Sequence, residues 1–485
     1  MQRTRTNKFS IKLSGVLLAL ITSAGCMVGP RYERPAAPVA PQYKEGASPD
    51  TAKANPIAYS NWWLVFHDDE LDRLEQQANT ANQDIHAAIA RVEQAQDYLK
   101  EARSYLFPTV SAGGSASRNR EAQNRPNNGN TAGLAATFND FQISMLLGYE
   151  IDFWGKLRHA AQAAAASEQS NEANLRFVHL VTGTGLAMNY FGLRELDAER
   201  EVLLATLEAL RQAEQLTEMR RRGGLASDYD VYQAKTLLDQ TDAQAKQIEI
   251  QRAEYEHAIA VLSGENPSTF SLQRSPLNET SPVIPAGIPS QLLERRPDIQ
   301  SLERTLAASN AQIGIARALQ FPQFTISGAA GFESVNPSSV FAWQNSLASL
   351  GAGITAPVFT GGRLKAQVEQ AKASYRETLA QYEQQVLTAF QQVEDQLSAI
   401  RILTDEANST LNAVNDARRT EEIAMNQYRT GLVDYLNVVN AQATLLYNQR
   451  TQTQIQGEQM VASVELIKAL GGGWLNIPNP AGNTP

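Results

Sequence analysis

Residues 141–156 read FQISMLLGYEIDFWGK, and this stretch decides the fold. Its apolar residues alternate with small or polar ones, with Leu146 as the one break, which is the period of a β-strand. A tryptophan-glycine-lysine turn follows, and no proline then occurs before Arg222. Segment 156–222 is therefore predicted to be a single helix, which would reach about 100 Å at ~1.5 Å per residue.

The same unit occurs a second time. Residues 353–359 end a strand, a glycine turn follows at 361–364, and a proline-free run continues to about Arg429. Matching anchors keep their order in the two halves: Asp84-Ile85 with Asp298-Ile299, Phe107-Pro108 with Phe321-Pro322, Gly224-Leu225 with Gly431-Leu432, and Val231 and Ala234 with Val438 and Ala441. Ordered anchors with slowly drifting offsets predict an internal duplication.

Residues 1–25 are predicted to be a signal peptide, because a basic start precedes an apolar stretch too short to span a membrane. Cys26, the only cysteine, follows small residues and is typical of a bacterial lipobox, whose thiol takes a diacylglycerol. Ser23 stands where leucine is usual in that motif. The alternative is an ordinary signal peptide cleaved nearby that leaves a free thiol. Met27 follows Cys26. An aspartate at that position would favour retention in the inner membrane, so its absence favours the outer membrane.

Charge and hydropathy restrict the partners. Removal of the signal peptide takes away four basic residues and no acids, so the net charge falls from −9 to −13. A chain this acidic is not expected to bind nucleic acid. No later apolar run approaches the ~20 residues that a membrane-spanning helix needs, so the mature chain can enter a membrane only as strands.

The predicted fold class is mainly α with a transmembrane β-barrel, built from a duplicated unit of strand and long helix with four strands per chain. The predicted segments are a signal peptide (1–25), a lipidated proline-rich N-terminal tether (26–60), a first repeat (61–264) with strands at about 109–118 and 141–153, a linker (265–297), a second repeat (298–473) with strands at about 324–332 and 346–359, and a C-terminal tail (474–485).

Helix lengths predict how each half is arranged. Helices 84–106 and 228–262 are together nearly as long as helix 156–222, so they are expected to stack end to end beside it. The strands would then lie at one end and the glycine turn at the other. The helices are rich in alanine and glutamine, which favours a tube with a wetted wall. The alternative is a coiled-coil stalk without a lumen.

The strands predict that the chain oligomerises. Four strands cannot close a barrel, since about eight is the smallest closed count. Unpaired backbone groups in lipid cost several kcal/mol each, so the sheet edges must be paired. Two copies of the chain would give eight strands and three would give twelve, and the strand count alone does not choose between them.

Motifs of catalysis and of metal binding are missing from the sequence. There is no phosphate-binding loop, no dinucleotide fingerprint and no Gly-x-Ser-x-Gly elbow. The five histidines are scattered, and none belongs to a His-Glu-x-x-His set. The sequence therefore predicts no enzyme, no catalytic residue, no metal site and no cofactor other than the covalent lipid on Cys26.

Three motifs carry a resemblance that covers essentially the whole mature chain. They are CMVGPRYERP at 26–35, WWLVFHD at 62–68 and ALGGGW at 469–474. With them the sequence is similar to the TolC-like outer membrane factors, in the NodT-type lipoprotein branch of RND efflux systems. The resemblance implies a homotrimer in outer membrane lipid, with a twelve-stranded barrel and a helical tunnel through the periplasm.

The resemblance also implies partners and a function. The tunnel would dock on a periplasmic adaptor, or membrane fusion, protein and on an inner-membrane pump. The trimer would be a passive, gated exit duct for small amphiphilic compounds or drugs. Two other cargoes stay open, namely proteins in type I secretion and metal ions. A non-conducting structural outer membrane lipoprotein is an alternative from another class.

Two helix turns are implied to contact the adaptor, although each could also be a plain turn without a partner. The residues concerned are Gly223, Gly224, Leu225, Ala226, Ser227, Gly431, Leu432, Val433 and Asp434. Related tunnels narrow through aspartates on the helix after the second turn, where this sequence has Asn437 and Asn440. Further gate candidates are Tyr428, Asp434 and Leu436. We therefore expect a gate that closes by hydrogen bonds and packing more than by charge.

Overall fold

The computed structural model describes residues 27–36, 40–45, 59–120, 137–277, 280–285 and 289–472. The predicted signal peptide, Cys26 and the C-terminal tail lie outside the described residues. The chain divides into two compact units, and each takes pieces from both repeats. The strand unit contains residues up to Pro35, Glu93–Ser170 and Leu302–Gln381, and the turn unit contains Ala36–Val92, Asn171–Ser301 and residues from Tyr382 onward.

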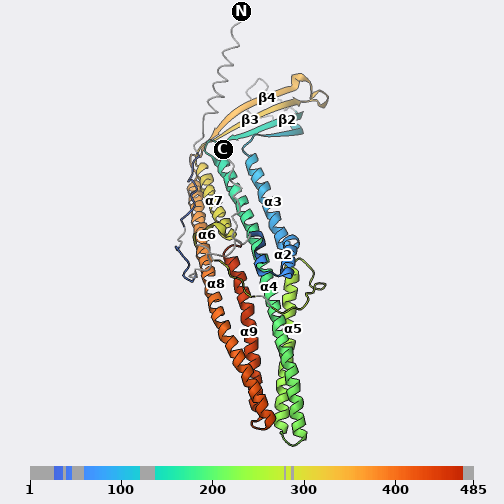
Figure 1. The fold of residues 1–485 in the computed structure, drawn as a ribbon. Coiled ribbons are helices and arrows are strands. Elements are labelled where there is room, and N and C mark those ends of the chain that lie inside the picture. The colour runs from blue at the N-terminus through green and yellow to red at the C-terminus, as the bar shows by residue number, and fades with distance from the viewer. Residues whose placement is uncertain are drawn as a thin grey trace, which may run out of the picture. The chain divides into compact units, whose positions relative to one another are not determined.

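The elements follow the duplicated order that the sequence predicts (Figure 1). The α4 helix has the predicted limits, and the two halves have the same sequence of helix, two strands, long helix and helix. The helices are α2 (Asp69–Ala81), α3 (Gln83–Ser104), α4 (Lys156–Arg222), α5 (Asp228–Leu262), α6 (Pro289–Arg295), α7 (Pro297–Ala318), α8 (Arg363–Thr430) and α9 (Tyr435–Ala469), with short 3-10 turns η2 (Tyr59–Phe66), η3 (Pro337–Ser339) and η4 (Trp343–Asn345). Among the described residues, no helix combines the length and the hydropathy that crossing a membrane requires.

One antiparallel sheet forms the strand unit's upper part, in the order β1-β2-β3-β4. Its strands are β1 (Thr109–Arg120), β2 (Thr137–Ile151), β3 (Gln323–Ser334) and β4 (Ser346–Thr355). β2 of the first repeat pairs directly with β3 of the second. This pairing explains why neither compact unit corresponds to a repeat. β4 ends before Pro357, earlier than predicted, because proline cannot donate a ladder hydrogen bond.

The register gives the sheet one apolar face and one polar face. Residues directly opposite each other in an antiparallel pair share a face. The apolar face joins Val110 and Ala112 of β1, Ile143, Met145 and Leu147 of β2, Phe324, Ile326 and Phe332 of β3, and Leu350 and Ile354 of β4. The other face joins Ser111, Ser115, Gln142, Ser144, Thr325, Ser327, Glu333 and Ser349. The alternation predicted for β2 alone therefore extends over all four strands.

In the turn unit, one polar side chain per repeat joins the two short helices. Asn82 donates from Nδ2 to the carbonyl oxygen of Leu262 at 2.9 Å, at the end of α5. Its Oδ1 accepts from the backbone N–H of Asp84 and of Ile85, at the start of α3. In the second repeat, Arg296 donates to the carbonyl oxygen of Ala469 at 3.0 Å. The end-to-end arrangement predicted from helix length is confirmed at both junctions.

The described part of the N-terminal tether in the strand unit is extended, as predicted, but it is fixed to the helices. The backbone N–H of Val28 donates to the carbonyl oxygen of Trp154 at 3.1 Å. The Tyr32 hydroxyl donates to Glu303 Oε1 at 2.5 Å, and the Asn310 amide donates to the carbonyl oxygen of Pro30. Proline richness predicts an extended chain, but it does not indicate which neighbours the chain will contact.

Candidate functional site

The first candidate turn joins α4 to α5 and contains a left-handed glycine. Gly224 has φ +72, where a side chain would be strained, and the backbone N–H of Leu225 donates back to the carbonyl oxygen of Arg220 at 2.8 Å. Ser227 then caps α5, because its hydroxyl accepts from the backbone N–H of Asp230 while the Asp230 carboxylate accepts from the backbone N–H of Ser227. Hydrogen bonds within the turn therefore end α4 and cap the start of α5.

The second candidate turn joins α8 to α9 and repeats this geometry in the second half of the chain. Gly431 has φ +79, and the backbone N–H of Leu432 donates back to the carbonyl oxygen of Gln427 at 2.8 Å. The cap differs between the turns, because Asp434 precedes α9 without a side-chain hydrogen bond to it. The Asn437 amide instead donates to the carbonyl oxygen of Asp434 at 3.4 Å, a weak contact.

Each turn presents one leucine to solvent. Leu225 is 71% exposed and Leu432 is 75% exposed. Both follow a left-handed glycine, which turns the backbone so that the next side chain points away from the helices. Large apolar side chains on the first turn of α5 and the last turn of α4 are exposed as well, namely Met219, Tyr229 and Tyr232. Apolar groups gathered at the surface indicate an interaction site.

Arg220 joins the two turns. Its guanidinium donates to the carbonyl oxygen of Arg429 at 3.0 Å and lies 4.7 Å from the ring centroid of Tyr428. Tyr428 packs in turn on Tyr435, with ring centroids 5.1 Å apart. The surrounding apolar cluster contains Ala234 from α5, Ala424 from α8, and Val438 and Ala441 from α9. The turns therefore form one packed tip of the turn unit, at the end where α4, α5, α8 and α9 meet (Figure 1).

The gate candidates fall into a buried and an exposed group. Tyr428 is 4% exposed within a single chain, so its ring is held inside the tip. Asp434, Leu436, Asn437 and Asn440 are exposed. Spacings of three and four residues bring the last three to one face of α9, so a neighbouring molecule could reach them. A lumen-facing position requires such exposure, which Tyr428 lacks in the isolated chain.

The charges at the first turn are largely balanced. The Glu218 carboxylate contacts Arg221 at 2.8 Å and Arg222 at 3.1 Å. The hydrogen bond from Arg221, followed by the one from Arg222, lowers the pKa of Glu218 to about 2. Arg221 also lies 3.4 Å from Asp228, across the turn. The exposed leucine is thus surrounded by paired charges rather than by a single-sign field.

Sequence reasoning missed Arg220 and Tyr435, which hold the tip together. Arg220 begins a run of three arginines that reads as an ordinary basic helix end. Tyr435 follows Tyr428 closely in sequence, but the turn at Gly431 between them hides that the two rings are in contact. A cation–π contact between segments from different halves of the chain leaves no local signal. Within the described ranges, no group of three potential ligand residues could hold a metal ion.

The chain is similar to known proteins over most of its length. The model of the family described as "Outer membrane efflux protein" matches residues 74–265 and 288–472. The toluene efflux pump outer membrane protein TtgC of Pseudomonas putida is 31% identical over 94% of this chain and 96% of its own. The pyoverdine export outer membrane protein OpmQ of Pseudomonas aeruginosa is 32% identical over 85% and 87%. The crystal structure of the Campylobacter jejuni CmeC outer membrane channel superposes with a TM-score of 0.87, at 26% identity over 93% and 95%.

Proposed function

Because the chain belongs to the outer membrane efflux protein family, we propose that three copies of it form a passive, gated exit duct for small amphiphilic compounds. The family is one of outer membrane channels of efflux systems, not one of enzymes. The duct is proposed to dock on a periplasmic adaptor and an inner-membrane pump, which supplies the energy. In this role the chain needs no catalytic group of its own.

The sheet is the observation that carries the proposal. Its two outer strands, β1 and β4, have no partner strand among the described residues of one chain. Such edges in lipid would each leave a row of unpaired backbone groups. Three copies would close them into twelve strands, with the apolar face toward lipid and the polar face toward a wet lumen.

The cargo is proposed to be set by the partners. Relatives of similar length and identity are named for toluene and for pyoverdine, two compounds of very different size and polarity. The polar face of the sheet presents serine, threonine, glutamine and Glu333, with no aromatic cluster among its described residues that would select one compound class. A wide polar lumen would pass whatever the pump delivers, which supports export of varied amphiphiles over a dedicated metal or protein route.

The packed tip is the proposed adaptor contact, with Leu225 and Leu432 as its anchors. Three chains would present six exposed leucines in a ring of paired turns. Glycine at both turns allows the backbone of a partner to approach closely. Cys26 is proposed to carry a lipid that keeps the N-terminus at the membrane, with the described residues from Met27 onward leading back along the helices.

The proposed gate gives a prediction that a bilayer recording can check. Amide side chains neither bind divalent cations strongly nor repel one another, so millimolar Mg²⁺ should block the wild-type trimer little. The double variant Asn437→Asp and Asn440→Asp adds two carboxylates per chain, and carboxylate rings bind hard divalent cations. Block should then appear at concentrations at least about tenfold lower. The variant Asn426→Asp, at an exposed position before the turn, is the charge control.

Two results would contradict this account of the gate. One is strong divalent block in the wild-type trimer, which would require an anionic ring, for example at Asp434. The other is a cation selectivity that disappears in Asn440→Ala, because this result would make the amide itself the selective group. Loss of conductance in the aspartate variant without Mg²⁺ would indicate misassembly, and trimers counted by gel filtration identify that case.

Dye retention in energised cells tests the function itself. Cells that lack the gene should retain more of a fluorescent amphiphile than cells in which the gene is restored. Conductance of the purified trimer is the accompanying measurement, because a parallel duct could mask the loss in cells. Equal retention together with a non-conducting trimer would refute the duct and favour a structural lipoprotein.

A further inference from the structure

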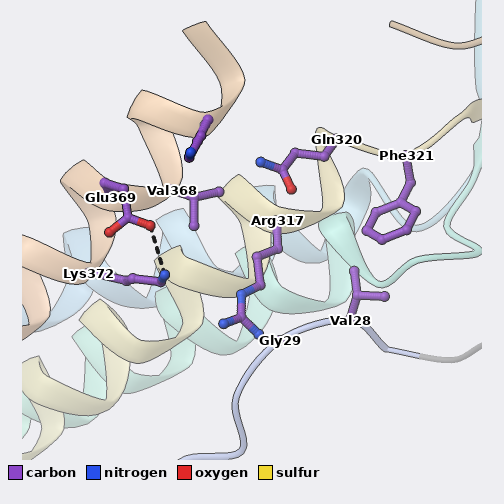
Figure 2. A pocket seen from close by; sticks show the side chains of 9 residues that line it. Val28, Gly29, Arg317, Gln320, Phe321, Val368, Glu369 and Lys372 are labelled. Carbon is purple, nitrogen blue, oxygen red and sulfur yellow. Dashed lines mark hydrogen bonds and ion pairs between the residues drawn. The ribbon is translucent and has the colours of Figure 1, made fainter. Parts of the chain in front are cut away.

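An open cavity of about 360 Å³ lies in the strand unit, between three segments of the chain. Val28 and Gly29 of the N-terminal segment form one side. The end of α7 contributes Arg317, the segment just after it contributes Gln320 and Phe321, and the start of α8 contributes Lys365, Val368, Glu369 and Lys372. Figure 2 shows Arg317 on α7, and Phe321 on the segment just after it, reaching toward the N-terminal segment, with Glu369 and Lys372 on the turns of α8.

The cavity has an excess of positive charge. Arg317, Lys365 and Lys372 line it, against the single carboxylate of Glu369. Lys372 and Glu369 form an ion pair at 2.8 Å, and this hydrogen bond, with smaller contributions from the charges of Arg376 and Lys365, holds the pKa of Glu369 below its usual range. One carboxylate can balance only one of the three cations that line the cavity. Within the described residues, neither the Arg317 guanidinium nor the Lys365 ammonium makes an ion pair. Two cations are therefore left for a ligand.

The internal duplication shows that this charge is a departure from the repeat. Lys365 corresponds to Arg158 of the first repeat, since each is the third residue of its long helix. Arg158 already has partners within the chain. Its Nε lies 3.1 Å from the Asp152 carboxylate, and its Nη2 donates to the Asp152 carbonyl oxygen. The position that corresponds to Asp152 is Phe359, which is 90% exposed. The second repeat has kept the cation and replaced its acid with an apolar side chain.

Aromatic residues at the strand ends place the cavity relative to a membrane. Trp154 stacks on Phe321 with ring centroids 4.6 Å apart and donates its indole N–H to the carbonyl oxygen of Pro322. Phe107 and Phe359, at the ends of β1 and β4, are mostly exposed. Aromatic girdles of this kind mark the membrane–water interface of barrels. Phe321 belongs to the girdle and also lines the cavity, so the cations lie at the level of lipid headgroups.

We propose that this cavity binds the phosphodiester of an anionic glycerophospholipid from the inner leaflet of the outer membrane. Arg317 and Lys365 would hold the phosphate oxygens, while Val28, Val368 and Phe321 provide apolar contacts for the glycerol and upper acyl carbons. A zwitterionic headgroup fits less well, because its positively charged ammonium group would be repelled by the cations that line the cavity. The inference rests on the proposed function, since it requires the strands to lie in the membrane.

The test uses the full-length, lipidated trimer purified in detergent. Short-chain phosphatidylglycerol, phosphatidylethanolamine and inorganic phosphate are titrated separately, and retained lipids are counted by native mass spectrometry. The wild-type trimer should bind phosphatidylglycerol in preference to the other two. The double variant Arg317→Gln and Lys365→Gln should bind it at least about tenfold more weakly, since each basic residue at a lipid surface strengthens binding severalfold.

Two further variants keep the test decisive. Lys100→Gln with Arg103→Gln removes the same charge from exposed positions on α3, and Arg103 is the repeat equivalent of Arg317. This control should bind like wild type. Arg317→Lys with Lys365→Arg keeps both charges and should also retain binding, which separates loss of the site from a folding defect.

Three outcomes would overturn the lipid site. They are unchanged phosphatidylglycerol binding in the glutamine variant, equal loss in the α3 control, and binding of inorganic phosphate as strong as that of the lipid. The last would assign the cavity to a free anion. Dye export is measured separately in cells. A duct that exports dye without selective lipid binding refutes this inference alone, whereas absence of export in cells and of conductance refutes the proposed function.

Discussion

Replacing both Leu225 and Leu432 by aspartate should raise dye retention to the level of cells that lack the gene. Each leucine is more than two thirds exposed in the chain, so the change should cost the fold little. At a docked adaptor each would bury its side chain, worth about 1.5–3 kcal/mol, and each aspartate would bring an unpaired charge to the contact. A trimer would suffer this loss six times over.

The matched control is the double variant Leu225→Met and Leu432→Met. Methionine keeps the apolar volume, so export should remain near wild type. Trimer yield and single-channel conductance should be the same in both variants, because the turns lie in loops whose backbone hydrogen bonds do not involve these side chains. Normal export by the aspartate variant at normal trimer yield would remove the leucines from the adaptor contact.

Local patterns were enough to predict most of the elements. The limits of α4 follow from a strand period that changes to a helix period at a glycine turn, and the turns at Gly224 and Gly431 follow from their repeat positions. Sheet order and register could not be read in this way. Which residue of β3 lies opposite Met145 depends on two repeats meeting, and no local pattern encodes a pairing between strands so distant in sequence.

In the candidate site, too, local features could be predicted from the sequence, whereas contacts between distant residues could not. Both turns were found because a glycine-leucine pair recurs at the same place in the two halves, and the resemblance implied their contact with an adaptor. The contact of Arg220 with Tyr428 was missed, because a cation–π pair joins residue types that also occur on any exposed helix. The excess positive charge in the cavity beside Val28 was not predicted either, for a related reason. Lysines spaced along a helix face look like ordinary solvated residues, and only the structure shows that Arg317 and the N-terminal segment lie beside them.

Glu75 is an ionisable residue that lies at a fully buried position. Its side chain is fully buried in α2, and neither carboxylate oxygen has a hydrogen-bond partner among the described residues. The helix facing it has a glycine there, and a methyl group on Gly183 would lie 2.7 Å from Oε2. Burial, with a smaller contribution from Asp72, raises the pKa of Glu75 to about 8. The acid is therefore neutral in the folded protein at neutral pH.

The raised pKa predicts how stability changes with pH. The unfolded chain releases the Glu75 proton above about pH 4.5 and the folded chain keeps it until about pH 8, so stability falls as pH rises between these values. At pH 7 the loss is on the order of 3 kcal/mol. Glu75→Gln has the same shape and cannot ionise, so it should be more stable than wild type at pH 8 and nearly equal at pH 4.5.

Unfolding midpoints at these two pH values, in one detergent, provide the measurement, and amide hydrogen exchange of α2 locates the effect. Glu70→Gln is the control, because Glu70 lies on the same helix but is partly exposed and paired with Arg73 at 2.8 Å. Exposed pairs contribute at most about 1 kcal/mol, so this variant should show no comparable gain at pH 8. A Glu75→Gln protein that is less stable than wild type at pH 8 would mean that the carboxylate is charged and has a partner in the assembled trimer.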